Sequence, residues 1–426
     1  MGGALSSLSA TTLGGDAIRN ALLRAGIDPA DVEHVIMGEV LQAGVGQAPA
    51  RQAAFKAGLA KTTTAETVNK VCASGLLAVA YGARVIADGD HRVVVAGGME
   101  SMSNAPYLLP NARSGYRYGD GVLVDAMVHD GLWDPYFDEA MASQGARVAA
   151  ELGVTRAVQD EFALRSHQRA HAAHEGGKLN AEIAPIRVAA KAKGKIVVDA
   201  VPATATARVP AMAGGAPSVW DHVAPQAMVA DPAVYSPYVS GEVPATLVDR
   251  DEPVRADASL DAMTKLKALD AGGTITAGNA PGVNDGAAAV VLSSAEYARA
   301  TGVEPLAEII DHAGVAWDPP YLALTPAMAS QKLLDRHGLS VRDIAVWEIN
   351  EAFAAVALTA ATKLGLDPEV VNLQGGAVAL GHPIGASGAR IVGAVIHQLR
   401  ARGGGYGIAA ICSGGGQGDA LLVKVG

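Results

Sequence analysis

A repeated pattern of helices and apolar strands constrains the fold of this 426-residue chain more than any other feature. Two stretches read as the same unit, in which a helix leads to an apolar strand, a second helix and further apolar strands. The paired segments are 12–40 with 325–351, 68–70 with 371–373, 92–96 with 407–411, and 287–292 with 419–423. Alternating apolar strands and helices predict parallel sheets covered by helices, so we expect an α/β protein with two similar halves.

A region that lacks this alternation interrupts the first half. Between residues 119 and 250 the sequence predicts two helices, at 139–152 and 156–176, but no regular run of strands. Seven prolines fall between residues 200 and 248, which predicts an irregular insertion because proline breaks helical periodicity. The expected domains are a first half from 1–118 and 251–297, an inserted loop domain at 119–250, and a second half at 298–426.

The two halves differ at their starts. The second half opens with the apolar run 307–315, whereas the chain enters the first helix of the first half almost at once. The repeat therefore predicts that the first sheet lacks one strand.

Charge and composition exclude several classes of protein. The formal charge of −10 argues against a nucleic-acid partner, and no apolar run is long enough for a membrane span. The start Met1-Gly2-Gly3-Ala4 lacks the basic and apolar parts of a secretory signal. Two cysteines in so long a chain favour a reducing compartment, and we expect a cytoplasmic protein.

Cys72 is the first candidate for chemistry. A β-favouring run leads into it, and an apolar helical pattern follows, with Leu76, Val79 and Ile86 among its members. A cysteine at a helix N-terminus has its thiolate stabilised by unpaired backbone N–H groups, which predicts a nucleophile. A buried cysteine that packs as a small hydrophobic residue fits this segment equally well.

Three further stretches carry polar residues in turns. They are Asn350-Glu351-Ala352-Phe353-Ala354, Gly381-His382-Pro383, and a run of glycines after Cys412. Singly, each is compatible with a structural loop or the start of a packed helix. Together they place both cysteines of the chain in small-residue turns at strand ends, one in each half, so we expect the thiols to meet between the halves. The His and Cys spacings form no zinc pattern, and no metal is expected.

These stretches closely resemble the motifs of the thiolase family. The matching runs are VNKVCASG around Cys72, NEAFA at 350–354, GGAVALGHPIGASGAR at 375–390 and CSGGGQG at 412–418. The spacings match as well, and the resemblance extends over nearly the whole chain, most closely to the branch that forms acetoacetyl-CoA. It implies a five-layer αβαβα core of two similar halves with a loop domain that covers coenzyme A. Thiolases also begin with a strand that has no equivalent in this sequence, and the resemblance implies that this strand lies in the middle of the first sheet.

The resemblance implies the role of each catalytic residue. His382 would take the proton from Cys72, whose thiolate attacks an acyl-CoA thioester to form an acyl-enzyme. Cys412 would act as general base on a second acetyl-CoA, and as acid in the reverse direction. One oxyanion site would use His382 and a water held by Asn350, and the other the backbone N–H groups of Cys72 and Gly414. No cofactor is implied, since coenzyme A is part of the substrate.

Further positions are implied to bind substrate. Arg255 aligns with an arginine that contacts the nucleotide end of coenzyme A, and the other binding positions are Met141, Ala277, Asn279, Pro281 and Phe353. Residues 156–195 hold eight Lys or Arg and four acidic residues, which fits a solvated helix face or a phosphate-binding surface. Ala140 and Ala142 replace the His and Gly that flank this methionine in short-chain enzymes, so a longer or branched acyl chain is compatible with the pocket.

Three other functions are compared with this sequence. A degradative 3-ketoacyl-CoA thiolase of broader chain length shares the same motifs. The related ketoacyl synthases use one cysteine with two histidines, and Cys412 argues against that class. A catalytically impaired paralogue that only binds acyl-CoA is supported by the strand expected to be missing. The resemblance implies a homo-oligomer, either a dimer or a tetramer.

Overall fold

A computed structural model describes residues 2–189 and 245–426. Most of the proline-rich insertion expected at 200–248 lies outside the described residues. The first half holds α1 (Ala10–Ala25), β1 (His34–Gly38), α2 (Pro49–Lys56), β2 (Thr64–Val68), α3 (Ser74–Ala87), β3 (Val93–Ser101), β10 (Asp285–Ser293) and α8 (Ala295–Thr301). The second half holds β11 (Glu308–Ala316), α9 (Thr325–His337), β12 (Ile344–Ile349), α10 (Ala354–Leu364), α11 (Ala377–Leu380), α12 (Ser387–Arg402), β13 (Gly405–Ser413) and β14 (Gln417–Val425).

Each half contains a four-stranded sheet, and the two sheets have related strand orders. The first runs β10-β3-β1-β2 and the second β11-β14-β13-β12. β1 is parallel to β2 and β3, and β12 is parallel to β13, whereas β10 and β14 are antiparallel to their neighbours. Both sheets are therefore mixed rather than wholly parallel as predicted, because the last strand of each unit returns directly beside its neighbour.

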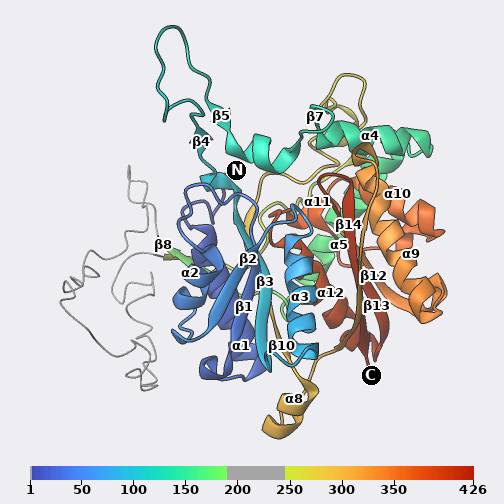
Figure 1. The fold of residues 1–426 in the computed structure, drawn as a ribbon. Coiled ribbons are helices and arrows are strands. Elements are labelled where there is room, and N and C mark those ends of the chain that lie inside the picture. Colours follow the sequence, from blue (N-terminus) through green and yellow to red (C-terminus); the bar gives the residue numbers. More distant parts are fainter. Residues whose placement is uncertain (1, 190–244) are drawn as a thin grey trace.

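The helices arrange these sheets in layers (Figure 1). α1 and α2 pack together, with α1 against β3 and β10 and α2 against β1 and β2, while α3 and α12 pack against each other between the two sheets. α9 packs on β11, β13 and β14, with α10 beside it. The class is mixed α/β as the sequence predicts. Glycines allow the halves to approach closely: a side chain at Gly98 would overlap the carbonyl oxygen of Gly385.

The position of β11 corrects one expectation. Among the described strands, β11 pairs only with β14 and lies at the end of its sheet. The strand that opens a half therefore lies at an edge, whereas it was expected in the middle of its sheet. The edge position follows from the antiparallel return of β14, which leaves its outer edge as the site where one more strand can be added.

The segment that interrupts the first half contains helices and short hairpins. It holds β4 (Tyr107–Leu108), β5 (Val124–Asp125), β6 (Trp133–Asp134), β7 (Glu139–Ala140), α4 (Met141–Glu151), α5 (Arg156–Glu175), β8 (Ile186–Ala189), β9 (Ala245–Val248) and α7 (Leu260–Thr264). The two predicted helices are confirmed as α4 and α5. The sequence pattern over residues 260–269 also favours a helix, but α7 ends at Thr264, and the N–H of Leu269 bonds the carbonyl of Ile275 instead. Within the described ranges, no helix is both long and apolar enough to cross a membrane.

Candidate active site

A strained turn presents Cys72 at the end of β2. Val71 directly before it has φ 45°, a left-handed conformation that a β-branched residue rarely adopts. The hydroxyl of Ser74 holds this conformation, accepting from Lys70 N at 2.8 Å and donating to Val71 O at 2.6 Å. Strained backbone of this kind persists where the surrounding structure holds a functional side chain in place. The turn fixes Cys72 just ahead of α3, which begins at Ser74.

The helix N-terminus was expected to stabilise the Cys72 thiolate and so to lower the pKa of the thiol, but the pKa is raised. The side chain is only 3% exposed, and burial raises the pKa of its thiol to about 12, with a further contribution from the nearby Glu100 carboxylate. The loss of hydration outweighs the helix N-terminus because a thiolate has no solvent to stabilise it there. The resting residue is therefore a neutral thiol, and a nucleophilic role needs a base at hand.

The second half brings Cys412 to the same place. Cys412 lies near the end of β13 and is fully buried, and burial together with the charge of Cys72 raises the pKa of its thiol. The Ser413 hydroxyl donates to the carbonyl of Lys70, and a Cβ at Gly414 would lie 3.2 Å from the Val71 side chain. The glycine turn after Cys412 thus packs directly on the Cys72 turn, as the repeat predicts.

His382 is held as a neutral imidazole with its base nitrogen unoccupied. Its backbone N–H donates to Asn284 Oδ1 at 2.9 Å, and its Nδ1 lies 2.6 Å from Ser387 Oγ. Because Ser387 donates its hydroxyl hydrogen to Pro383 O, the network assigns the imidazole hydrogen to Nδ1. Nε2 then carries a lone pair and, within the described residues, has no hydrogen-bond partner. Burial lowers the pKa of His382 to about 3, with the Arg390 charge adding to the effect.

Ser387 is a positioning residue that the motifs did not single out. Replacing it with alanine frees Nδ1 from its acceptor, so the imidazole can adopt the tautomer that has no lone pair on Nε2. We expect Ser387→Ala to lower kcat by roughly 10-fold to 100-fold with little change in KM, because the effect is on the base and not on substrate binding.

The control for Ser387→Ala is Ser330→Ala. Ser330 is also buried in a helix and donates to the carbonyl of a proline four residues earlier, Pro326, but it lies on α9. Steady-state kinetics of both variants and their melting temperatures separate the two effects. Equal losses of kcat in the two variants would show that Ser387 acts only through stability.

Asn350 offers an unoccupied amide at the site. It follows β12, its backbone N–H bonds Ala410 O at 2.9 Å, and its side chain is fully buried. Neither its Oδ1 nor its Nδ2 has a hydrogen-bond partner among the residues that the structure describes. A buried polar atom without a partner costs about 1–3 kcal/mol, so such a group is typical of a site that takes a polar ligand or water.

The sequence did not predict two buried acids near Cys72, Glu100 and Glu39. Glu100, on β3, accepts from the backbone N–H groups of Val40, Leu41 and Gly385, and so joins the turn that carries His382 to the first half. Burial raises the pKa of Glu100 to about 7. Glu39 is fully buried, neither carboxylate oxygen has a described partner, and burial with the Glu100 charge raises its pKa to about 8. The sequence signal that could have identified Glu39 is its position directly after the apolar strand β1.

The raised pKa of Glu39 makes stability depend on pH. Between about pH 4.5 and 8 the folded protein binds this proton more tightly than the unfolded chain, so the free energy of unfolding falls as pH rises. Glu39→Gln removes the ionisation and is expected to stabilise the protein at pH 8 by about 1–3 kcal/mol, with little effect at pH 5.

Thermal melts at both pH values test this prediction, with Glu33→Gln as the control. Glu33 is only partly buried and pairs with Arg92, and that pairing lowers its pKa, so the same substitution removes a favourable interaction there. A Glu39→Gln variant that is no more stable than the wild type at pH 8 would contradict the assignment.

The predicted substrate-binding residues differ in how deeply they are buried. Met141 and Phe353 share an apolar cluster with Cys412, and Pro281 is half-buried, whereas Ala277 and Arg255 are exposed. Asn279 is buried, and its amide hydrogens go to Asp160 and Thr274 O. Asn279 therefore holds a turn and has no hydrogen left for a ligand.

Three arginines of the basic stretch are paired within the protein. Arg156 pairs with Asp160, while Arg165 and Arg169 both pair with Glu369 of the second half. These contacts favour a structural role for this face of α5. Lys191, Lys193 and Lys195 lie outside the described residues.

Comparisons with known proteins match nearly the whole chain. Residues 1–210 and 237–296 match the family model described as "Thiolase, N-terminal domain", and residues 303–425 match "Thiolase, C-terminal domain". The chain is 44% identical over 424 residues to an acetyl-CoA acetyltransferase of Cupriavidus necator, covering 99% of this chain and 95% of that protein. It is 43% identical to an acetyl-CoA acetyltransferase of Escherichia coli, covering 99% of this chain and 95% of that protein. It is 42% identical to acetyl-CoA acetyltransferase 2 of Arabidopsis thaliana, covering 99% of this chain and 93% of that protein.

Proposed function

The chain belongs to the thiolase family, and from that premise we propose that it is an acetyl-CoA acetyltransferase, which joins two acetyl-CoA molecules into acetoacetyl-CoA and coenzyme A. The layered halves would form the five-layer core of that family. One set of observations supports the proposal. Cys72 and Cys412, from different halves, are buried and interact electrostatically, and the turn after His382 packs against the start of α3 at Gly75. His382 Nε2 has no hydrogen-bond partner among the described residues.

The first half-reaction transfers an acetyl group to Cys72. His382 Nε2 takes the thiol proton, and the thiolate attacks the thioester carbon of acetyl-CoA. The carbon–sulfur bond to coenzyme A breaks, and the leaving thiolate takes a proton from Cys412. The state that results contains acetyl-Cys72, a Cys412 thiolate and protonated His382, so atoms and charge balance.

The second half-reaction forms the carbon–carbon bond. The Cys412 thiolate removes a proton from the methyl group of a second acetyl-CoA, and the enolate carbon attacks the acetyl group on Cys72. The bond from Cys72 to the acetyl carbon breaks, and His382 returns its proton to the thiolate. Both thiols and the imidazole are then neutral again, which matches the resting state favoured by their burial.

Burial makes these charges costly, so the charged intermediates need fixed donors. The backbone N–H groups of Cys72 and Gly414 would stabilise the oxyanion of the tetrahedral intermediate. Asn350, with its unpartnered amide, would hold the water that joins protonated His382 in stabilising the enolate oxygen. These groups are set before substrate arrives, and preorganised donors in a dry site are more effective than solvent.

The substrate would enter from the side of the inserted domain. Met141 and Phe353, which pack with Cys412, would contact the acyl group, and the exposed Arg255 would meet the nucleotide end of coenzyme A. The alanines that flank Met141 leave room beside the acetyl group. That observation supports a second candidate, a degradative 3-ketoacyl-CoA thiolase of broader chain length.

Product analysis across chain lengths tests the proposal. Purified protein mixed with acetyl-CoA should form acetoacetyl-CoA and free coenzyme A in equal amounts. Thiolysis rates measured with 3-ketoacyl-CoA substrates from four to twelve carbons should be highest at four. A maximum at a longer chain would assign the degradative function, and no turnover of any substrate would argue for a binding protein without catalysis.

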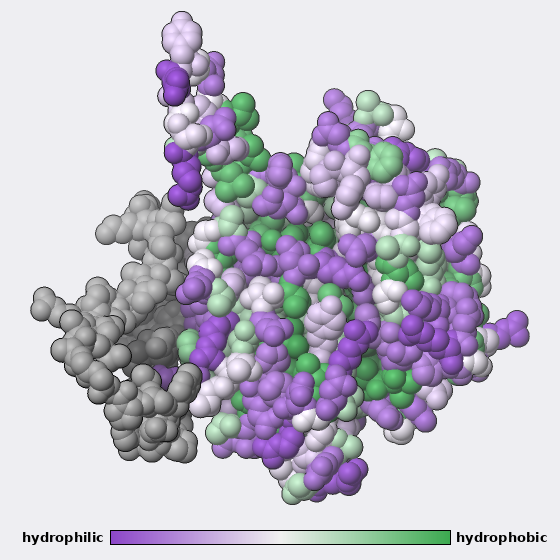
Figure 2. Space-filling view, viewed as in Figure 1, coloured by the Kyte–Doolittle hydropathy of each residue, from purple (hydrophilic) through white to green (hydrophobic). Residues whose placement is uncertain are grey.

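We further propose that the protein assembles as a homo-oligomer in the cytoplasm. The arm formed by β4, β5 and the loop between them stands clear of the body (Figures 1 and 2). It exposes the large apolar side chains Tyr107, Tyr118, Val122 and Leu123. An exposed apolar arm of this kind is typical of an interaction surface, and light scattering of the purified protein measures the dimer or tetramer directly. Both cysteines are free thiols, as the reaction requires and a reducing compartment maintains.

A further inference from the structure

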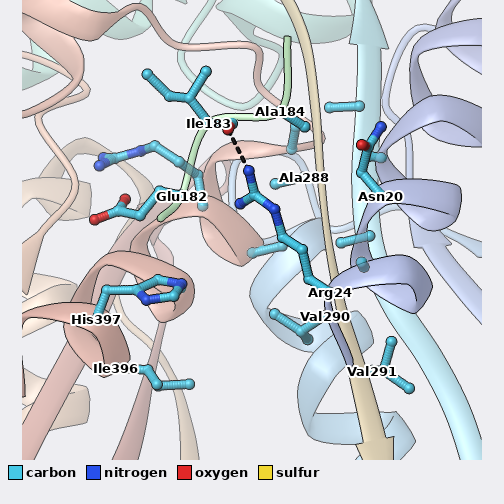
Figure 3. A pocket seen from close by; sticks show the side chains of 18 of the residues that line it. Asn20, Arg24, Glu182, Ile183, Ala184, Ala288, Val290, Val291, Ile396 and His397 are labelled. Atoms are coloured by element: carbon cyan, nitrogen blue, oxygen red, sulfur yellow. Dashed lines mark hydrogen bonds between the residues drawn. The ribbon is translucent and has the colours of Figure 1, made fainter. Parts of the chain in front are cut away.

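Charged side chains lie between the two halves in two places. The first is a groove of about 1510 Å³ beside β10, where Arg24, Glu182 and His397 are among the lining residues (Figure 3). None of the described residues that line this groove belongs to the turns that carry Cys72 and Cys412. The second place adjoins those turns, so it is the one that can act on the two thiols.

The second place is an ion pair between Lys70 and Asp419. Lys70 Nζ lies 2.7 Å from Asp419 Oδ2, and Asp419 is fully buried whereas the Lys70 side chain is 18% exposed. His312 Nε2 lies 2.7 Å from the other carboxylate oxygen, Oδ1. Arg84 Nη2 lies 3.1 Å from His312 Nδ1, and because an arginine can only donate, the network assigns the ring hydrogen to Nε2, which donates to Asp419. Lys70 and Arg84 belong to the first half and the other two residues to the second, so the network joins the halves.

Asp419 is the charged residue on an otherwise apolar part of β14. Side chains alternate along a strand, so Leu421 and Val423 share its face, and both belong to an apolar cluster that includes residues of α3 and α12. The β11 residue opposite Asp419 is Gly314, where a Cβ would lie 3.3 Å from Asp419 Oδ1 and 3.5 Å from Lys70 Nζ. The glycine therefore leaves room for the pair.

An ion pair at this place is explained better by geometry than by stability. Taking two charges out of water costs about as much as their attraction returns, and apolar side chains of similar size would stabilise the fold as well or better. An ion pair, however, fixes which residues face each other. Asp419 follows Gly418, the β14 partner of Cys412, and Lys70 comes two residues before Cys72. The pair therefore sets the register between the two thiol turns.

The backbone of Lys70 also connects these turns. Its carbonyl accepts from the Ser413 hydroxyl, directly after Cys412, and its N–H donates to the Ser74 hydroxyl, which holds the strained Cys72 turn. Both the main chain and the side chain of Lys70 are thus fixed by contacts on either side of the junction.

The turn that carries His382 reaches the first half by a different contact. A Cβ at Gly75, at the start of α3, would lie 2.9 Å from the carbonyl oxygen of Gly385. This approach of two backbones does not involve Lys70. Removing the ion pair should therefore leave His382 in place beside Cys72 and affect chiefly the separation of the two thiols.

We propose that Lys70 and Asp419 are positioning residues for the formation of the carbon–carbon bond. The inference rests on the proposed function, in which the enolate made at Cys412 attacks the acetyl group on Cys72. Acetylation needs Cys72 beside His382, and removal of the methyl proton uses groups of the second half alone, so neither step depends on the pair. The bond-forming step needs the two thiol turns at one fixed separation, which the pair imposes.

The test measures three rates on each variant. They are acetylation of Cys72 by rapid-quench mass spectrometry, deuterium exchange into the methyl group of acetyl-CoA, and formation of acetoacetyl-CoA. In Lys70→Met we expect the third rate to fall roughly 10-fold to 100-fold, the effect of a misplacement of about 1 Å on a bond-forming step. The first two rates should stay within about 3-fold of the wild type. A purely structural role would lower all three rates in the same proportion, because less folded protein would be present.

A double variant and a control complete the test. Lys70→Met leaves the buried charge of Asp419 with His312 alone, which weakens the fold. Adding Asp419→Asn removes that charge and retains an acceptor for His312 Nε2, so the melting temperature should lie within about 3 °C of the wild type while the same single rate falls. Lys332→Met is the control and should retain all three rates, because Lys332 donates to Gly314 O at 3.2 Å and so joins α9 to β11 within the second half.

Each outcome decides the role of the pair. The inference is overturned if the double variant forms acetoacetyl-CoA at the wild-type rate, if all three of its rates fall together, or if it does not fold. It is also overturned if Lys332→Met shows the same loss. A wild-type protein that forms no acetoacetyl-CoA would overturn the proposed function as well, whereas wild-type turnover with an unaffected double variant overturns only the positioning role.

Discussion

Replacing Cys72 with alanine is expected to lower the rate of acetoacetyl-CoA formation on the order of 10⁴-fold or more. The sulfur is the only atom at this position that can accept the acetyl group, so both half-reactions lose their covalent intermediate. The side chain is small and only 3% exposed, so removing one sulfur should leave the fold intact. Initial rates with acetyl-CoA and the mass of the intact protein measure the two consequences, lost turnover and the lost acetyl adduct.

Cys72→Ser provides a graded control. It retains a nucleophilic atom, but a buried hydroxyl is harder to deprotonate than a thiol, so we expect a rate far below that of the wild type. In the wild type, peptide mapping should place the acetyl group on Cys72. An acetyl group found on Cys412, or an adduct that persists in Cys72→Ala, would exclude Cys72 as the acyl carrier.

The repeat made much of this arrangement predictable from sequence. The repeat identifies β1 and β12 as equivalent strands of the two halves, and likewise β3 and β13. It also places the two cysteines on different halves. Periodicity carries that information because each strand and helix must bury one face. The edge position of β11 was not predictable, since pairing order depends on contacts between strands that are distant in the chain.

The electrostatics of the site could not be predicted from the motifs. A cysteine before a helix suggested a stabilised thiolate, but the pKa of Cys72 is raised because the second half covers it and removes water. Ser387 acts on His382 through its own hydrogen bond to Pro383, a relation that only coordinates define. Glu39 and Glu100 are separated by sixty residues, and their proximity arises from the pairing of β1 with β3.

In the proposed mechanism, the neutral resting state explains why the reaction uses two thiols. Burial lowers the pKa of His382 and raises the pKa of both thiols, so these three side chains are neutral before substrate binds. Each proton moves only as a thioester bond forms or breaks. The acyl transfer itself and the fixed donors then offset the energetic cost of each charge. A side reaction with water is suppressed because neither thiolate persists.

Replacing Cys412 with alanine is expected to separate the two half-reactions. Condensation should fall on the order of 10⁴-fold or more, because no other group remains to remove the methyl proton of the second acetyl-CoA. Acetylation of Cys72 should fall by less than about 100-fold, because the departing coenzyme A thiolate is itself moderately stable and can leave without a proton. Acetyl-Cys72 should therefore accumulate on the variant.

Two measurements resolve this prediction. Rapid-quench mass spectrometry follows acetyl-Cys72, and exchange of deuterium into the methyl group of acetyl-CoA reports proton removal. The expected variant acetylates but does not exchange. Ser413→Ala is the neighbouring control: it removes the bond to Lys70 O while retaining the Cys412 thiol, so exchange should continue. If Cys412→Ala exchanged deuterium at the wild-type rate, the base would have to be another group, and His382 would be a candidate because its Nε2 has no hydrogen-bond partner among the described residues.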